Sequence, residues 1–272
     1  MTVTTIRPPK GWVPIDLKEL WASRELLYFL IWRDIKIRYK QTVLGFAWAI
    51  IQPVVMMVVF SLFFGTLIKV PSENVPYPLF SYSALVPWTL FANGVTRASN
   101  SLIQDANIIR KVYFPKLLLP LSGVLSPLVD FFIAFVVLIG LMFYFGYRPG
   151  IAMLWLPIFL ILEVMFTLGI GLWLSAINVE YRDVAYIVPF LLQIWLFASP
   201  VIYSVNTLPE RFHLAYNLMN PMSGIIEGFR WAISGTTAPG YLLVASAAII
   251  LFILVSGVFY FRRHEKAFAD VV

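Results

Sequence analysis

The sequence predicts an all-α membrane protein with six transmembrane helices. Of its 272 residues, 60% are hydrophobic and only 12% are charged, whereas soluble domains carry about 25% charged residues. The apolar residues also gather in long runs, and about 20 consecutive apolar residues span a bilayer as a helix. A chain of this length accommodates about six such runs together with their connecting loops.

Six apolar segments qualify as spans, and the chain divides around them. The spans lie at about 43–68, 79–99, 117–146, 151–177, 185–204 and 240–261. Ser, Pro, Asn and Gly residues interrupt the second segment, which makes it the weakest of the six. The predicted units are an N-terminal segment at 1–42, a transmembrane domain at 43–261 and a tail at 262–272.

Residues 205–239 fit neither a loop nor a span. They are too apolar for a solvated loop, and prolines and glycines interrupt them too often for a span. Irregular backbone at membrane depth needs protein or water around it. We therefore expect two short re-entrant helices that dip into the outer leaflet.

Residues 16–31 predict an amphipathic helix that lies in the membrane interface. Asp16 can cap its start, and Glu19 three residues later suits a capping box. The apolar residues of one broad face are Leu17, Leu20, Trp21, Leu27, Tyr28 and Ile31. A packed surface helix is the alternative, and the span that follows directly favours the interface. Because no apolar stretch precedes Leu26, we expect the first span to direct insertion.

Lysine and arginine residues are distributed unevenly between the two sides of the predicted bundle. If both termini are cytoplasmic, all but four of the 20 Lys and Arg residues lie inside. The four outside are Lys69, Arg148, Arg211 and Arg230. Membrane proteins keep most of these residues on the cytoplasmic side, so the sequence predicts this orientation. The net charge of +6 is then a signal of orientation, and we expect no nucleic acid partner.

The sequence gives no support for catalysis by this chain. It contains no GxxxxGK[ST] phosphate loop, no HExxH and no GxSxG, and its only histidines are His213 and His264. It also lacks cysteine, which excludes disulfides and cysteine metal sites and leaves the redox compartment open. We expect no metal and no cofactor on this chain. An intramembrane enzyme that acts on lipid-linked sugar would need a catalytic constellation that the sequence does not show.

Two carboxylates lie inside predicted spans, Asp130 in the third and Glu163 in the fourth. Both lie near mid-depth, and charged groups at that depth are costly and often functional. A proton relay is one interpretation. The other, which we favour, is that Ser, Thr or Trp groups satisfy each carboxyl group or that it is simply protonated.

A basic segment precedes the first span and is a candidate site for a diphosphate headgroup. Arg and Lys at the cytoplasmic interface attract phosphate. The candidate residues are Arg33, Lys36, Arg38, Tyr39 and Lys40. Anchoring by generic lipids under the positive-inside rule is the alternative, and it explains any single one of these residues equally well.

Aromatic and amide side chains share one face in each of two spans. Trp48, Gln52 and Met56 follow one another in the first span. The matching residues of the fifth span are Tyr186, Phe190, Gln193 and Phe197, with spacings of 4, 3 and 4. Rings pack on the apolar faces of sugars and amides bond to hydroxyls, which suits a sliding sugar chain. Lipid-facing or core packing is the alternative, and the mid-span glutamines make a polar pathway comparably plausible.

Residues 105–116, DANIIRKVYFPK, predict a short cytoplasmic helix that Pro115 closes. Its apolar residues are Ile108, Ile109, Val112 and Tyr113. Such a helix docks on a soluble partner or lies on the membrane surface, and composition does not separate the two.

Several of these segments resemble one transporter family. The stretch RDIKIRYKQTVLGFAWAIIQP at 33–53 resembles the start of ABC-2 type polysaccharide export permeases, the membrane subunits of O-antigen, capsule and teichoic-acid exporters. Further matches follow in the family's order and cover nearly the whole chain: RKVYFPK at 110–116, NVEYRDV at 178–184, SPVIYS at 199–204 and NP at 220–221. Together they are specific to the family, though not to one substrate.

The resemblance implies an ABC-2 exporter fold and a homodimer in the bacterial inner membrane. Two copies of a separate ATPase subunit would bind ATP and Mg²⁺, and a polymer on an undecaprenyl diphosphate carrier would be the substrate. The interfacial helix and the basic segment would form the cytoplasmic entrance, the first and fifth spans would line the path at the dimer interface, and residues 205–239 would match outer re-entrant helices. The coupling helix that contacts the ATPase would contain Asp105, Asn107, Ile108, Ile109, Arg110, Lys111 and Tyr113.

Two other functions remain open on the sequence. An ABC-2 exporter of small lipids or drugs would share the topology but show fewer aromatic residues along its path. A proton-coupled secondary transporter would use Asp130 and Glu163 and would need no ATPase.

Overall fold

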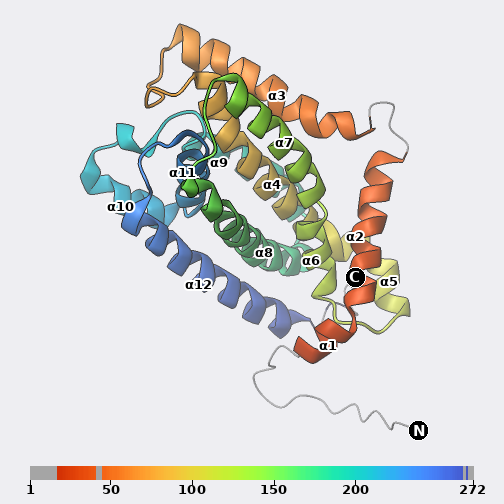
Figure 1. Cartoon of the computed structure of the whole chain (residues 1–272). Helices are drawn as coiled ribbons and strands as arrows, with labels where there is room; N and C mark the ends of the chain where they lie inside the picture. The colour runs from red at the N-terminus through yellow and green to blue at the C-terminus, as the bar shows by residue number, and fades with distance from the viewer. Residues whose placement is uncertain (1–16, 41–44, 266–267, 269–272) are drawn as a thin grey trace.

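The computed structural model describes residues 17–40, 45–265 and 268, and these residues form a helical bundle without strands (Figure 1). The α-helices are α1 (Leu17–Ala22), α2 (Arg24–Tyr39), α3 (Trp48–Phe60), α4 (Tyr77–Gln104), α5 (Ala106–Lys111), α6 (Leu118–Leu125), α7 (Leu128–Tyr144), α8 (Leu156–Glu180), α9 (Val184–Ala198), α10 (Glu210–Met219), α11 (Met222–Ser234) and α12 (Gly240–His264). A π-helical stretch, Ser61–Leu67, extends α3, and 3₁₀ turns cover Gly45–Ala47, Ile151–Trp155 and Val205–Thr207.

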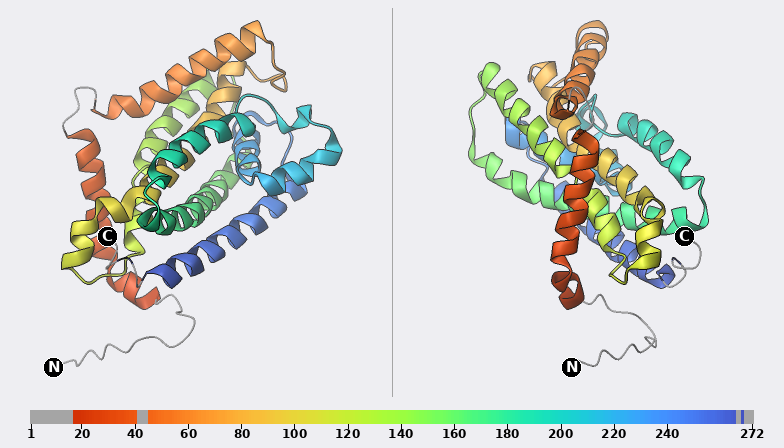
Figure 2. Two further views of the ribbon diagram at one scale, coloured as in Figure 1. Left: turned by 180° about the vertical axis from the view of Figure 1, so that it is seen from behind. Right: turned by 90° about the vertical axis from the view of Figure 1, so that its right-hand side faces the viewer.

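Helices α4 and α8 form the centre of the bundle. They pack along each other, α12 packs on α8, and α4 also contacts α3, α6, α7, α9 and α11. Figure 1 shows α3 and α7 on one side of this centre and α12 on the other. The two views of Figure 2 show α7 and α9 on opposite faces of the bundle.

Small residues bring α4 and α8 into close contact. A Cβ atom on Gly94 would lie 2.5 Å from the methyl group of Thr167, and one on Gly171 would lie 2.6 Å from the Cβ atom of Ala98. Helices in membranes use such small residues to let their backbones approach. Because residue numbers rise together along both helices, α4 and α8 run in the same direction.

Helix α12 approaches α8 in the same way. A Cβ atom on Gly257 would lie 2.4 Å from the carbonyl oxygen of Gly169. One turn further along, the rings of Trp173 and Tyr260 stack at 4.1 Å. The two helices therefore also run in the same direction. This is the direction expected of α4, α8 and α12 as the second, fourth and sixth spans, because successive spans alternate in direction.

Among the described residues, four helical segments are long and apolar enough to cross a membrane. They are Gly45–Leu67, Leu118–Tyr144, Ile151–Glu180 and Gly240–His264, which match the predicted first, third, fourth and sixth spans. The predicted second span falls on α4, whose side chains are mostly buried in protein, and this burial removes the need for a strongly apolar surface. The fifth falls on α9, which has 15 residues. Six spans therefore remain a prediction, and so does the membrane depth of the two short helices α10 and α11.

The N-terminal helix differs from its prediction. The helix breaks at Ser23, and α2 then continues through the basic segment to Tyr39. Asp16, the predicted cap, lies outside the described residues. Leu30 is buried, whereas Trp21 and Tyr28 of the predicted apolar face are exposed. An exposed apolar surface on α1 and α2 remains suited to the membrane interface.

A hydrophobic cluster, which we call the end cluster, joins α2 and α5 to one end of the bundle. Its buried members are Leu30, Leu102, Ile109, Phe114, Leu117, Leu118, Leu119, Leu172, Ala176, Val179, Phe261 and Phe268. Figure 1 shows α1, α2 and α5 at this end and α10 and α11 at the opposite end. The end cluster therefore fixes the positions of the two segments that the sequence predicts to meet substrate and ATPase.

Candidate functional site: a basic helix, a short end helix and two exposed helix faces

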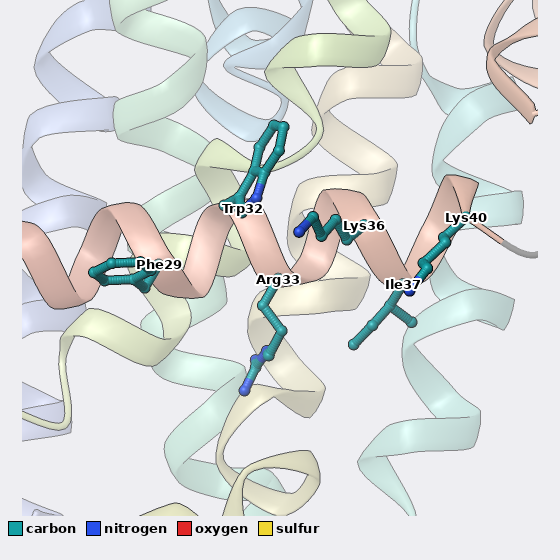
Figure 3. A pocket seen from close by; sticks show the side chains of 6 residues that line it. All are labelled: Phe29, Trp32, Arg33, Lys36, Ile37 and Lys40. Carbon is teal, nitrogen blue, oxygen red and sulfur yellow. The ribbon is translucent and has the colours of Figure 1, made fainter.

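One face of α2 lines a pocket of about 450 Å³. Its lining residues are Phe29, Trp32, Arg33, Lys36, Ile37 and Lys40, which Figure 3 shows along a single helix. They combine apolar side chains with three of the five predicted entrance residues. The Lys36 ammonium group lies 5.5 Å from the centre of the Trp32 ring, a cation–π contact. Five of these residues belong to α2 and Lys40 directly follows it, so this one segment supplies all six lining residues.

Arg33 connects α2 to the start of α5. Its guanidinium group donates two hydrogen bonds to Asp105, at 2.6 and 2.8 Å, and also contacts the neighbouring Asp34 at 2.9 Å. The hydrogen bond to Asp105 is the main cause that raises the pKa of Arg33 above its usual value. Arg33 is therefore engaged by two carboxylates, and a phosphate would have to compete with Asp105 for it.

Arg38, near the end of α2, forms an ion pair with Asp130 in the first turn of α7. Burial and the positive charge of Arg97 lower the pKa of Arg38 to about 10. Next to it, the rings of Tyr39 and Phe46 stack, with their centres 4.1 Å apart. The sequence suggested Ser, Thr or Trp partners for Asp130, or a neutral acid, and the structure gives it an arginine partner.

Glu163 is fully buried in α8, and neither oxygen of its carboxyl group has a hydrogen-bond partner among the described residues. Phe159 one turn earlier packs against Gly228 of α11, and Thr167 one turn later packs against Gly94 of α4. An ionised carboxylate in such an apolar setting would be costly. No hydrogen bond joins Glu163 to Asp130 in the described chain, so a proton relay between the two lacks a direct link.

Helix α5 is anchored on one side and exposed on the other. Ile109 is buried in the end cluster, whereas Asn107, Arg110 and Lys111 are exposed. The helix ends at Lys111 and the backbone becomes extended at the next residue. Tyr113 therefore leaves the predicted helix, and 87% of its surface is exposed. Of the predicted coupling residues, Asp105 directly precedes α5, five lie within it, and Tyr113 follows it as a projecting aromatic ring.

The predicted path residues of α3 lie on its exposed side. Trp48, Gln52 and Met56 are exposed. The side of α3 that packs against α4 and α7 carries Ala49, Pro53, Met57 and Phe60. The Gln52 amide has no hydrogen-bond partner within the described chain.

The predicted path residues of α9 share the same pattern. Tyr186, Phe190, Gln193 and Phe197 are all exposed. The buried residues of α9 are Val184, Val188, Leu192 and Leu196, on the side that packs against α4 and α8. Gln193, like its counterpart on α3, makes no hydrogen bond among the described residues. An amide on an apolar helix surface needs water or a polar partner, so both exposed faces suit a polar pathway or a second copy of the chain.

These features define a multi-pass membrane protein with a basic helix, α2, and a small exposed helix, α5, at one end of its bundle. The chain belongs to the ABC-2 type transporter family, whose model matches residues 25–234. The matched region contains α2, α5, and the exposed faces of α3 and α9.

Named relatives are polysaccharide exporters. The O-antigen export system permease protein RfbA of Myxococcus xanthus is 30% identical over 256 residues, which cover 92% of this chain and 97% of the relative. The protein of the same name from Klebsiella pneumoniae is 30% identical over 250 residues, or 91% and 95% of the two chains. The polysialic acid transport protein KpsM of Escherichia coli is 22% identical over 240 residues, or 88% and 93%.

Proposed function

We propose that this chain is the membrane subunit of an ATP-driven exporter of polysaccharide carried on undecaprenyl diphosphate. The observation that carries the proposal is the similarity to O-antigen export permeases along 92% of the chain. The chain works as a homodimer with two copies of an ATPase subunit in the bacterial inner membrane. It has six spans, and both of its termini are cytoplasmic.

The ATPase supplies the power stroke, because this sequence has no phosphate loop of its own. Its contact is the exposed side of α5 together with Tyr113, which projects from the bundle end. The ion pair of Arg33 with Asp105 ties α5 to α2. A displacement of α5 by the ATPase is therefore passed to the interfacial helix as well as to the spans.

The sugar chain passes between two copies of the chain, along the exposed faces of α3 and α9. Both faces combine aromatic rings with a glutamine, and the described residues of one chain cover neither face. A second copy that faces them completes a polar, aromatic passage. Glutamine amides bond to sugar hydroxyls there, and the rings pack on the apolar faces of the sugars.

The diphosphate binds first at the basic face of α2. Arg33 and Arg38 already have carboxylate partners, whereas neither Lys36 nor Lys40 has one among the described residues. We therefore assign the first phosphate contacts to the two lysines, which line the pocket with Trp32. Arginine and lysine at this interface attract anionic headgroups.

Reconstitution in liposomes tests this function. The permease and its ATPase are incorporated together, and ATP-dependent movement of a lipid-linked polysaccharide into the vesicle lumen is measured. Lys36→Ala/Lys40→Ala is expected to weaken export at low substrate concentration while the complex still assembles. Lys69→Ala, at the opposite end of the chain's first span, is the matched control. Export by the permease without any ATPase would refute the proposal.

The same assay separates the alternatives. Glu163→Gln removes a titratable group from the bundle interior, and normal ATP-dependent export by this variant would exclude an obligatory proton relay. Preferential transport of small lipids or drugs over the polymer would favour the other branch of the family.

A further inference from the structure

The end of α9 is held by polar contacts that the proposed function does not use. The carbonyl oxygen of Ala198 accepts hydrogen bonds from the Tyr216 hydroxyl at 2.7 Å and from the Asn220 amide at 3.2 Å. Asn220 also donates to the Ser199 hydroxyl at 3.0 Å and accepts from the Trp195 indole at 3.0 Å. Since the last carbonyls of a helix lack partners within it, these contacts satisfy α9 where it ends.

The segment that follows α9 is held by a buried arginine. Arg230 of α11 has no exposed surface. Its guanidinium group contacts Glu227 at 3.0 Å and donates to the carbonyl oxygen of Pro200 at 2.8 Å. Glu227 in turn accepts a hydrogen bond from the backbone of Val205 at 3.1 Å. The guanidinium group also lies 3.6 Å from the centre of the Phe80 ring of α4. Arg230 thus connects α11 to α4 and to the segment that follows α9.

The same segment is tied to the start of α4. The Tyr77 hydroxyl donates to the carbonyl oxygen of Ile202 at 2.7 Å. Glu73, in the loop before α4, accepts from the Ser204 hydroxyl and from the Asn206 amide, the latter at 2.6 Å. Irregular backbone inside a membrane protein needs such internal partners, and here they come from α4 on one side and α11 on the other.

Two motifs that had no role in the proposed function form these contacts after α9, which we call the joint. SPVIYS at 199–204 supplies the backbone and hydroxyl groups that are held, and NP at 220–221 supplies the amide that holds α9. Burying a whole arginine is costly unless it is paired and hydrogen-bonded. An apolar side chain would fill the same space at lower cost, so the arginine is better explained by the position that it imposes.

We propose that Asn220 and Arg230 are positioning residues, which pin the outer end of α9 to α11 and α4. The proposal rests on the proposed function insofar as α9 lines the export path. With its outer end pinned, α9 cannot tilt or turn alone without breaking these contacts. The path therefore opens at this end by movement between two copies of the chain, with α9, α4 and α11 moving together.

Three variants test the positioning role. Asn220→Ala removes the bonds to the end of α9, and Arg230→Gln/Glu227→Gln removes the buried pair without leaving one charge alone. Arg211→Gln, which changes an exposed arginine on α10, is the matched control. In the reconstituted complex, we expect the first two variants to export about tenfold more slowly, the factor that corresponds to about 1.4 kcal/mol. We expect the control to match the wild type, and the ATPase rate and the amount of assembled complex to stay unchanged in all three.

A covalent tether separates positioning from general folding. The chain has no cysteine, so Glu73→Cys/Asn206→Cys creates a unique thiol pair across the joint, and a short bifunctional thiol reagent can connect it. Without substrate, we expect the cross-linking yield to be high in this background and to fall when Asn220→Ala is added. Formation of the tether is expected to restore export to the Asn220→Ala chain.

Each outcome is decisive for the pinning proposal. Wild-type export by both interior variants, loss of assembled complex from both, an unchanged cross-linking yield, or failure of the tether to restore export would each overturn it. Failure of the unmodified complex to export polymer would instead refute the proposed function. The cross-linking yield, measured without substrate, would still show whether Asn220 holds the segment that follows α9 in place.

Discussion

The contact between Arg33 and Asp105 predicts that α2 and α5 are energetically coupled. Asp105→Asn removes the charge that the Arg33 guanidinium group meets at 2.6 and 2.8 Å. Hydrogen bonds to charged groups contribute about 1.5–3 kcal/mol each, but partial exposure weakens such a pair. About a third of the Arg33 side chain is exposed, at 32%, and Asp34 remains as a second partner. We therefore expect a coupling energy of about 1–2 kcal/mol.

A double-mutant cycle measures this coupling. The wild type, Arg33→Gln, Asp105→Asn and the double variant are purified in detergent, and their free energies of unfolding are compared. Asp34→Asn is the matched control, because Asp34 contacts Arg33 from the adjacent position of α2 and does not bridge to α5. The double variant is expected to be about 1–2 kcal/mol more stable than the sum of the two single effects predicts.

A transport assay on the same variants measures the amount of polymer exported per ATP hydrolysed. If the pair passes movement from α5 to α2, Asp105→Asn lowers this ratio more than Asp34→Asn does. Additive effects on unfolding, or equal effects of the two carboxylate substitutions on the export ratio, would refute the reasoning.

Three further predictions follow from single contacts. Gly257→Ala is expected to destabilise the fold by about 1–3 kcal/mol, since its Cβ atom would lie 2.4 Å from the carbonyl oxygen of Gly169. Thermal unfolding in detergent measures this loss. Gly140→Ala is the control and should cause no loss of stability, because its Cβ atom would meet open space. Asn178→Ala removes a 2.8 Å hydrogen bond to a backbone carbonyl of α4 and is expected to cost about 0.6–1.7 kcal/mol in the same measurement. Gln193→Leu is expected to slow polymer export while the assembled complex and its ATPase rate stay unchanged, and unaltered export would argue against a path along α9.

Four of the predicted spans coincide with long apolar helices of the described chain, because those helices keep wide apolar surfaces. Hydropathy was weak on α4 for a physical reason: hydropathy measures suitability for lipid, and α4 meets mainly other helices. Its serines bond to carbonyl groups of their own helix, as Ser83 does to Phe80, so they cost little inside the protein. The N-terminal helix was predicted at 16–31, whereas α2 continues through the basic segment to Tyr39. There Arg33 and Arg38 find carboxylate partners across the bundle end.

The long-range partners of the arginines had no signal in the sequence. Arg33 and Asp105 are 72 residues apart, and Arg38 and Asp130 are 92 apart. A charge count assigns such residues to a side of the membrane but does not pair them. Arg230 was counted only as one of four exterior cations, yet it is fully buried. A glutamate three residues earlier on the same helix face was the one local indication of a partner.

The internal pairing of these arginines changes which groups are left to meet substrate. Charges at membrane depth are costly without partners, and the fold has engaged Arg33, Arg38 and Arg230 with its own carboxylates. The cations without a carboxylate partner on the pocket face of α2 are then Lys36 and Lys40 among the described residues. Lys36 lies on the helix that Arg33 ties to α5, and Lys40 directly follows that helix. A diphosphate held by these lysines would therefore bias the position of α2, and through Asp105 the position of the segment proposed to contact the ATPase. Linkage between the two sites is reciprocal, so occupancy of the basic face is expected to change the affinity of the permease for its ATPase.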